Sequence, residues 1–260
     1  MGTVAGGLLL VAVCLGATAA NAQTPAERVT LAPTGALRVG VYPGSPILMV
    51  KGKSGENRGL TVDLGDELGR RLGLPVALVS YTRVAEVLEG VKLGNVDFTI
   101  TNATPSRAKD VDFMPNLLSL EVGYLVPGGS VLDSADAVDK PGIRVGVIKG
   151  ATSETRLPRV LKNASVVVVP SIKEAPKFFD AKELDALATN KPILFELSDD
   201  LPGSRVLPGR WAVEHVAIAI PKGREAGHAF LRGFTDEVKK NGVLERAVTL
   251  SGLRGSIPAD

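Results

Sequence analysis

One short pattern occurs twice in this chain, and the repetition limits the possible folds more than any other feature of the sequence. Residues 37–41 read Leu-Arg-Val-Gly-Val, and residues 143–147 read Ile-Arg-Val-Gly-Val. Further along, residues 97–102 and 185–190 each begin with Asp and end with Thr-Asn, with mainly apolar residues between. Short apolar runs bounded by polar residues predict buried strands. The repeat therefore predicts two related α/β lobes that face each other.

The stretch from residue 96 to residue 107 changes from a strand-like to a loop-like sequence. It begins with an apolar run and continues as Thr, Asn, Ala, Thr, Pro and Ser before an arginine. Ligands bind α/β sheets at the carboxyl ends of the strands. The residues that we expect near a ligand are therefore Asn102, Ala103, Thr104 and Arg107, together with Asn190 from the second copy.

Strands and helices alternate in the first part of the chain. Leucines recur every four residues after Gly59, which predicts an amphipathic helix that ends at Gly73. The predicted order is a strand at 37–41, a helix at 60–72, a strand at 76–79, a helix at 84–91 and a strand at 96–100. This alternation predicts a mostly parallel sheet flanked by helices.

The remaining segments predict a second lobe and a return to the first. Strands are expected at 111–115, 122–126, 144–148, 166–169, from 185 and at 216–220, and helices at 153–161, 175–179, 225–240 and 243–248. Because the last elements follow the second lobe, we expect them to pack on the first. Lobe 1 would then contain 29–117 and 216–260, and lobe 2 would contain 118–215. Two crossings between the lobes would form a hinge.

Composition and charge argue against several classes of protein. Of 260 residues, 45% are hydrophobic, and 30 basic against 28 acidic side chains give a net charge of +2. The basic residues form no run with interleaved aromatic residues, which argues against a nucleic-acid surface. Cys14 is the single cysteine, and His215 and His228 are isolated from other metal-binding residue types, so we expect no metal and no cofactor.

Residues 1–22 predict a secretory signal peptide. They contain no charged side chain, include an apolar run at 8–15 and end in Ala-Asn-Ala before Gln23. This small-x-small pattern is typical of a cleavage site, although the positive segment usually found before the apolar run is missing. The Gly, Thr and Asn content disfavours a membrane anchor. We therefore expect a periplasmic protein that begins at Gln23.

Four segments, in the same order, resemble those of the periplasmic solute-binding proteins of family 3, the polar amino-acid receptors of ABC importers. They are Gly-Leu-Thr-Val-Asp-Leu at 59–64, Thr-Pro-Ser-Arg and Val-Asp-Phe within 104–113, Val-Gly-Val-Ile-Lys-Gly-Ala-Thr-Ser-Glu at 145–154 and Ala-Ile-Pro-Lys-Gly at 219–223. The resemblance covers residues 37–252. It implies an α/β fold of the type II periplasmic-binding-protein kind, with two lobes around a ligand cleft, working as a monomer.

The resemblance also implies roles for individual residues. Arg107 would hold the ligand's carboxylate through a bidentate pair, because the guanidinium fork matches a carboxylate. Asn102 stands where the family usually has Ser or Thr and would support the same carboxylate. The turn at 150–152, with the Thr152 hydroxyl, would add donors from the other lobe. The implied partners are a small-molecule solute and the membrane permease of an ABC importer.

Several positions depart from the family's pattern. The acidic residue that usually binds the ligand's α-ammonium aligns with Asn190, which carries no charge. Among the aromatic residues that usually enclose the ligand's side chain, Tyr42 remains, but the second position is Val84, with Arg83 before it. We therefore expect a carboxylate without an ammonium group, or a dicarboxylate that also uses Arg83, to bind better than a standard L-amino acid.

Other interpretations compete with these roles. Arg107 and Arg83 are also typical of solvated surface side chains, Trp211 of packing near a hinge, and Asn102 and Asn190 of helix caps. An enzyme on the same fold, of the secreted cyclohexadienyl dehydratase type, would need a general acid or base. The polar loops offer no acidic or histidine side chain, so we expect no enzyme activity. A sensory or accessory periplasmic binding module is a third alternative.

Overall fold

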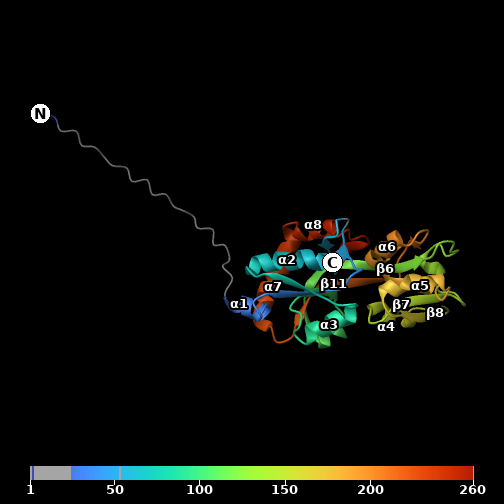
Figure 1. Cartoon of the computed structure of the whole chain (residues 1–260), viewed down its shortest axis with the longest axis horizontal. Helices are drawn as coiled ribbons and strands as arrows, with labels where there is room; N and C mark the ends of the chain where they lie inside the picture. The colour runs from blue at the N-terminus through green and yellow to red at the C-terminus, as the bar shows by residue number, and fades with distance from the viewer. Residues whose placement is uncertain (1, 3–24, 53, 260) are drawn as a thin grey trace.

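The computed structural model describes residue 2 and residues 25–52 and 54–259. The predicted signal peptide at 1–22 therefore lies outside the described residues, apart from residue 2. Within the described ranges, no helix is both long enough and apolar enough to cross a membrane. The chain forms an elongated body with a group of helices at each end (Figure 1).

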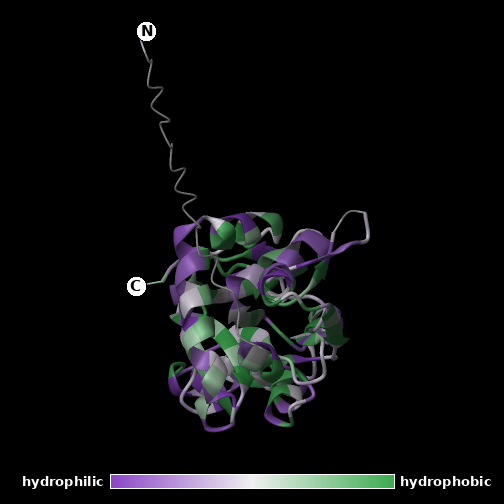
Figure 2. Cartoon of the chain, turned by 90° about the vertical axis from the view of Figure 1, so that its left-hand side faces the viewer, coloured by the Kyte–Doolittle hydropathy of each residue, from purple (hydrophilic) through white to green (hydrophobic). Residues whose placement is uncertain are grey.

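The first group of elements combines the two ends of the chain. The amino-terminal part contributes α1 (Pro25–Leu31), β1 (Leu37–Val41), β2 (Val50–Lys51), β3 (Asn57–Arg58), α2 (Leu60–Leu72), β4 (Val76–Ser80), α3 (Val84–Lys92) and β5 (Thr99–Asn102). The carboxyl-terminal part contributes α7 (His228–Lys240), α8 (Val243–Leu250) and β12 (Ser256–Pro258). Seen from this end, the helices carry hydrophilic and hydrophobic residues side by side (Figure 2), as amphipathic helices covering a core do.

The second group of elements comes from the middle of the chain. It contains β7 (Arg144–Ile148), α4 (Thr152–Arg156), β8 (Ser165–Val169), α5 (Ala175–Asp180), β9 (Ala186–Asn190), α6 (Lys191–Asp200) and β10 (Arg205–Val206). The helix predicted at 153–161 is wrong in length, since α4 is followed by a 3-10 turn at Leu157–Arg159. Pro158 lacks the amide N–H that an α-helix would use there.

Two long antiparallel strands, β6 (Val111–Val126) and β11 (Ala212–Pro221), connect the groups. The main sheet has the order β5-β11-β6-β9-β7-β8, with β10 and β12 also on β6, and β1 pairs with β4 in parallel. β7 is parallel to both β8 and β9. Two strands were predicted at 111–115 and 122–126, but β6 is continuous. Register shifts opposite it on β11, around Val216 and Ala217, let the strands stay paired past Pro115.

Each group of elements has its own hydrophobic core. The first core contains α2, β1, β5 and α7 side chains, and β6 enters it with residues up to Leu120. The second group has a cluster on each face of its sheet, which β6 enters with Tyr124 and Leu125. The change between cores therefore occurs within β6, over the residues between Leu120 and Tyr124.

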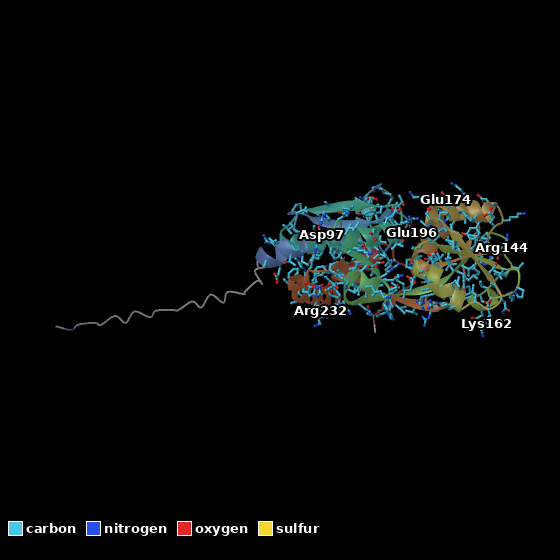
Figure 3. All side chains as sticks on the ribbon, turned by 90° about the horizontal axis from the view of Figure 1, so that it is seen from below. Asp97, Arg144, Lys162, Glu174, Glu196 and Arg232 are labelled. Atoms are coloured by element: carbon cyan, nitrogen blue, oxygen red, sulfur yellow. The ribbon has the colours of Figure 1, made fainter. Side chains whose placement is uncertain are left out.

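The arginine of the repeated pattern makes the same contacts in both groups. Arg38 donates to Asp97 from its backbone N at 2.9 Å, from Nε at 2.8 Å and from Nη2 at 2.7 Å. Arg144 donates to Asp185 from the same three atoms at 2.8, 2.9 and 2.9 Å. Asp97 and Arg144 lie in opposite halves of the molecule (Figure 3). The repeated Arg and Asp therefore join the first and third strands of each unit.

The glycine of the repeated pattern also has one role in both groups. A Cβ at Gly40 would lie 2.8 Å from Val96 Cγ1, and a Cβ at Gly146 would lie 2.6 Å from Leu184 Cδ1. Val96 and Leu184 directly precede the two aspartates. Only glycine at this position of the first strand leaves room for Val96 in one group and for Leu184 in the other. Packing alone is therefore enough to explain why the glycine is repeated.

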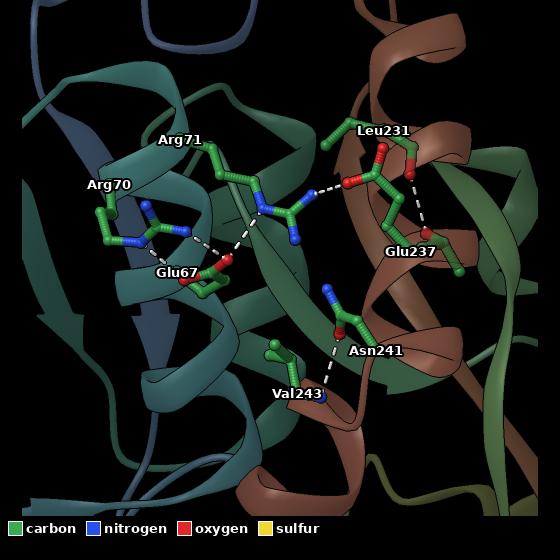
Figure 4. A network of polar contacts seen from close by, with 8 residues as sticks. Glu67, Arg70, Arg71, Leu231, Glu237, Asn241 and Val243 are labelled. Atoms are coloured by element: carbon green, nitrogen blue, oxygen red, sulfur yellow. Dashed lines mark hydrogen bonds and ion pairs between the residues drawn. The ribbon is translucent and has the colours of Figure 1, made fainter. Parts of the chain in front are cut away.

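Within the first group, charged contacts fix the carboxyl-terminal helices to the amino-terminal elements. Arg224, which precedes α7, pairs with Asp97 at 2.7 Å. Glu67 on α2 accepts from Arg70 and Arg71, which lowers the pKa of Glu67 to about 2. Arg71 also pairs with Glu237 on α7, bridging the two helices (Figure 4).

Candidate functional site

A small cavity lies where the two groups of elements meet, and we call it the central cavity. The space open to water-sized molecules is about 40 Å³, which is room for one or a few waters. Its polar lining is Tyr42, Ser45, Thr101, Asn102, Arg107, Thr152, Ser153, Thr189, Asn190 and Glu214, and its apolar lining includes Ile47, Val84, Ala151 and Ile193. Both Thr-Asn pairs of the repeat reach this cavity from opposite sides.

Arg107, in the 3-10 turn that follows β5, directs its guanidinium into the central cavity. Nη1 donates to Thr101 Oγ1 at 2.8 Å and to the Asn102 carbonyl oxygen at 3.4 Å, and Nη2 donates to the Gly150 carbonyl oxygen at 3.3 Å. All three acceptors are neutral, and burial lowers the pKa of Arg107. A half-buried guanidinium that is bonded to neutral groups keeps spare donors and a positive charge for an anion.

Asn102, Thr152 and Glu214 form a hydrogen-bonded cluster across the cavity. Asn102 Nδ2 donates to Thr152 Oγ1 at 2.9 Å and to Glu214 Oε2 at 2.6 Å. The three residues come from β5, the first residue of α4 and β11, so the cluster joins the first group of elements to the second. Glu214 is 5% exposed. Burial raises the pKa of Glu214, while the Arg107 charge and the Asn102 hydrogen bond oppose that effect.

Glu214 corrects an expectation drawn from the sequence. The polar loops contain no acidic side chain, as the sequence indicated, but Glu214 reaches the cavity from the strand β11. β11 begins at Ala212, earlier than the strand predicted at 216–220. Alternation along this longer strand places Glu214 on the same buried side as Val216, with His215 exposed between them. This alternation is the sequence signal from which Glu214 could have been predicted as a buried residue. The expected preference for solutes without an ammonium group was based on Asn190 and did not take this acidic side chain into account.

Asn190 and Ser153 differ in how their polar atoms are used. Asn190 Oδ1 accepts from the Ile193 backbone N at 3.4 Å, so Asn190 caps α6 while lining the cavity. Ser153 is 2% exposed, and its hydroxyl is among the buried polar atoms of the described residues that have no hydrogen-bond partner. A buried hydroxyl without a partner is unfavourable unless a ligand or water completes it. Ser153 was absent from the sequence-based candidates.

Tyr42 and Val84, at the two positions where the family usually has aromatic residues, both line the cavity. Tyr42 is buried, which raises the pKa of Tyr42, and its hydroxyl bonds Ser45. Val84, at the start of α3, presents a small apolar surface. Arg83 lines a side pocket next to Tyr42, outside the central cavity, and pairs with Glu86 at 3.1 Å.

Thr104 and Ala103 lie outside the central cavity. Thr104 Oγ1 accepts from the Arg107 backbone N at 3.3 Å and lines an outer recess of about 300 Å³ between α3 and α4. The Ala103 backbone N donates to the His215 carbonyl oxygen at 2.8 Å, and Ala103 lines neither space. The structure thus brings together Arg107, Asn102, Thr152, Asn190 and Tyr42 and leaves these two apart.

The remaining residues noted in the sequence have structural contacts. His215 Nδ1 lies 2.7 Å from Ser119 Oγ, and His228 Nε2 lies 3.3 Å from Asp112. The described part of the chain contains no group of three or more residues able to hold a metal ion. Trp211 packs against Tyr124 of the second group at a ring-centroid distance of 6.3 Å.

Comparison with known sequences identifies related proteins over most of the chain. Residues 37–249 match the family described as bacterial extracellular solute-binding proteins, family 3. The chain is similar to the ABC transporter glutamine-binding protein GlnH of Bacillus subtilis (strain 168), with 25% identity over 193 residues that cover 73% of this chain and 70% of that protein.

Solved structures share the fold. The solute receptor for L-cysteine of Neisseria gonorrhoeae has a TM-score of 0.75 at 23% identity, covering 88% of this chain and 94% of the receptor. The ancestral amino-acid-binding protein AncCDT-1, a precursor of cyclohexadienyl dehydratase, has a TM-score of 0.71 at 24% identity, covering 86% of this chain and 97% of that protein. These likenesses confirm the two-lobed α/β fold class predicted from the sequence.

Proposed function

This chain belongs to the bacterial extracellular solute-binding proteins of family 3, and we propose that it is the receptor of an ABC importer for a small solute that carries a carboxylate. The observation that carries the proposal is the half-buried guanidinium of Arg107, which faces the central cavity and donates only to neutral oxygens. Burying a charge without a partner is costly. A solute carboxylate would supply the missing counter-charge through a bidentate pair.

The proposal places lobe 1 at 29–117 and 216–260 and lobe 2 at 118–215, with the hinge in β6 and β11. Asn102 to Thr152, Arg107 to Gly150 and Arg58 to Glu196, at 3.5 Å, are contacts between these lobes. A space of about 40 Å³ does not admit an amino acid, so the lobes must separate for a solute to enter. The closed form would then dock on the permease, and secretion would place the protein in the periplasm.

A ligand screen tests the proposal. Refolded, ligand-free protein is heated with each standard L-amino acid and with keto, hydroxy and dicarboxylic acids, and the melting temperature is recorded. A solute at 100 times its dissociation constant stabilises by about 2.7 kcal/mol, a rise of about 5–10 °C. Arg107→Met should abolish the rise, and Arg232→Met, at an exposed arginine of α7 (Figure 3), should preserve it. Equal shifts in both variants would refute the role of Arg107.

A second candidate function is a dehydratase-type enzyme, and one observation favours it. Glu214 is a buried carboxyl in the cavity, and burial raises the pKa of Glu214, as a general acid requires. The similarity to a dehydratase precursor is compatible with it. Incubation with cyclohexadienyl acids, followed by ultraviolet detection of an aromatic product, separates the two functions. Turnover that Glu214→Gln abolishes would establish the enzyme, and binding without turnover would leave the receptor.

A further inference from the structure

The central cavity is lined by two groups of opposite charge, the half-buried Arg107 and the buried Glu214. Arg107 enters it from the turn after β5, and Glu214 enters it from β11. Both residues belong to the described part of the chain, and no direct ion pair joins them there, although each charge influences the other. Arg107 bonds carbonyl and hydroxyl oxygens, and Glu214 bonds an amide and a hydroxyl. The two charges thus face one space without neutralising each other by contact.

This arrangement discriminates between solutes by their charge. A solute with a carboxylate and an ammonium group adds no net charge, and each end can meet a group of opposite sign. A carboxylate without the ammonium would leave one uncompensated negative charge beside Glu214. An amine without the carboxylate would leave one uncompensated positive charge beside Arg107. Uncompensated buried charges cost several kcal/mol, so a zwitterion fits this cavity best.

We infer that Glu214, from the crossing strand β11, binds the ammonium group of an α-amino acid whose carboxylate is held by Arg107. The inference rests on the proposed receptor function and names the class of its solute. Asn102 and Thr152 act as positioning residues for Glu214, because both are bonded to its carboxylate. Asn190 caps α6 with its side-chain oxygen, which is therefore engaged. The Ser153 hydroxyl, buried and without a partner, remains for the solute's carboxylate.

A purely structural role for Glu214 makes a different prediction. Glu214 accepts from Asn102 in the first group of elements and lies beside Thr152 in the second, so it could serve only to hold the closed form together. In that case its replacement would weaken binding of every solute by a similar factor. An ammonium-binding role weakens only solutes that carry the ammonium. The ratio of two affinities therefore separates the roles.

Glu214→Gln provides the main test, because it removes the charge and keeps the shape. The tightest-binding standard L-amino acid from the screen is compared by calorimetry with its des-amino carboxylate and its decarboxylated amine. Wild-type protein should bind the amino acid tightest. Glu214→Gln should weaken the amino acid by about 30-fold or more, the effect of removing one partner of a buried charge pair, and should not weaken the des-amino acid.

A matched control and the contrary outcomes complete this test. Glu174→Gln removes a carboxylate that pairs with Lys177 in the second group of elements, away from the cavity and the hinge, and it should change neither affinity. An amino-acid affinity that stays within about threefold in Glu214→Gln, or equal losses for both solutes, overturns the inference and leaves the receptor function standing. If wild-type protein binds neither amino acids nor other carboxylates, the receptor function fails and the inference fails with it.

If Glu214→Gln does not fold, the pH dependence of solute binding by wild-type protein tests whether Glu214 binds the ammonium group. The charged and titratable groups that face Glu214 are Arg107, Arg156 and Tyr42, and guanidinium and phenol groups ordinarily titrate only at about pH 10 or above. Burial raises the pKa of Glu214, so this carboxyl ionises as the pH rises from acid towards neutral. Ionised Glu214 attracts an ammonium and repels a carboxylate. Amino-acid affinity should therefore rise with pH, and des-amino-acid affinity should fall. Parallel slopes for the two solutes would overturn the inference.

Discussion

Replacing the aspartate of each repeated unit by asparagine should destabilise the protein by very different amounts. Asp97 and Asp185 make the same three contacts with their arginines, but the Asp97 side chain is 0% exposed and also pairs with Arg224, which is 9% exposed. Asp185 is 31% exposed and its partner Arg144 is 40% exposed. Removing one partner of a buried pair costs about 3–5 kcal/mol, whereas an exposed pair contributes about 1 kcal/mol or less.

Thermal unfolding of ligand-free protein measures the difference. At about 2–4 °C per kcal/mol, Asp97→Asn should lower the melting temperature by about 6–20 °C and Asp185→Asn by no more than about 4 °C. Far-ultraviolet circular dichroism reports on the whole fold, and fluorescence of Trp211 reports on the second core, where that single tryptophan packs against Tyr124. The two signals show whether the cores unfold together.

Equal losses in the two variants would refute the reasoning. Such a result would mean that the shared geometry of the repeat, and not the burial of its charges, sets the contribution of each pair. A larger loss for Asp185→Asn would contradict it further, because that pair is screened by solvent.

Three further predictions concern other parts of the chain. Burial and the neighbouring Asp66 raise the pKa of Asp63 to about 6; since the folded state then binds the proton more tightly than the unfolded state, stability should fall as pH rises from about 4 to 7, and Asp63→Asn should flatten the melting-temperature profile. Gly40→Ala should cost about 1–3 kcal/mol in urea unfolding because its Cβ would meet Val96 and Val87, whereas Gly233→Ala on α7, with open space around it, should cause no loss. Intact mass of secreted material should show an amino terminus at Gln23; retention of residues 1–22 would contradict the predicted cleavage.

The parts of the fold that could be predicted from the sequence are those with a recognisable sequence pattern. Helix α2 follows from leucines every four residues and ends at Gly73, which has a φ of 62°. The repeat revealed two units because Arg38, Gly40 and Asp97 and their counterparts meet the same packing demands in each. The leucine spacing lies within one short stretch, and the repeat appears when the chain is compared with itself, so both are visible without knowledge of the tertiary structure.

Long-range pairing explains what the sequence did not reveal. β6 looked like two strands because Pro115 and Asn116 interrupt its apolar pattern, and only the partner strand β11 shows why the chain stays extended. Glu214 was not predicted as a cavity residue, because its carboxylate reaches the cavity from the strand β11 and not from a loop. Asn102 and Arg107 were predictable because they lie at and after the end of a strand. Ala103 was placed nearby by the same argument but lines neither space.

Small-angle X-ray scattering with and without a solute tests the central claim, that two lobes close on a carboxylate held by Arg107. The solute is the L-amino acid that raises the melting temperature most, added at saturation, and the samples are wild-type protein and Arg107→Met. The account predicts that the radius of gyration of wild-type protein decreases on addition and that the radius of the variant does not change. A solute that binds wild-type protein without any decrease, or an equal decrease in Arg107→Met, would contradict the account.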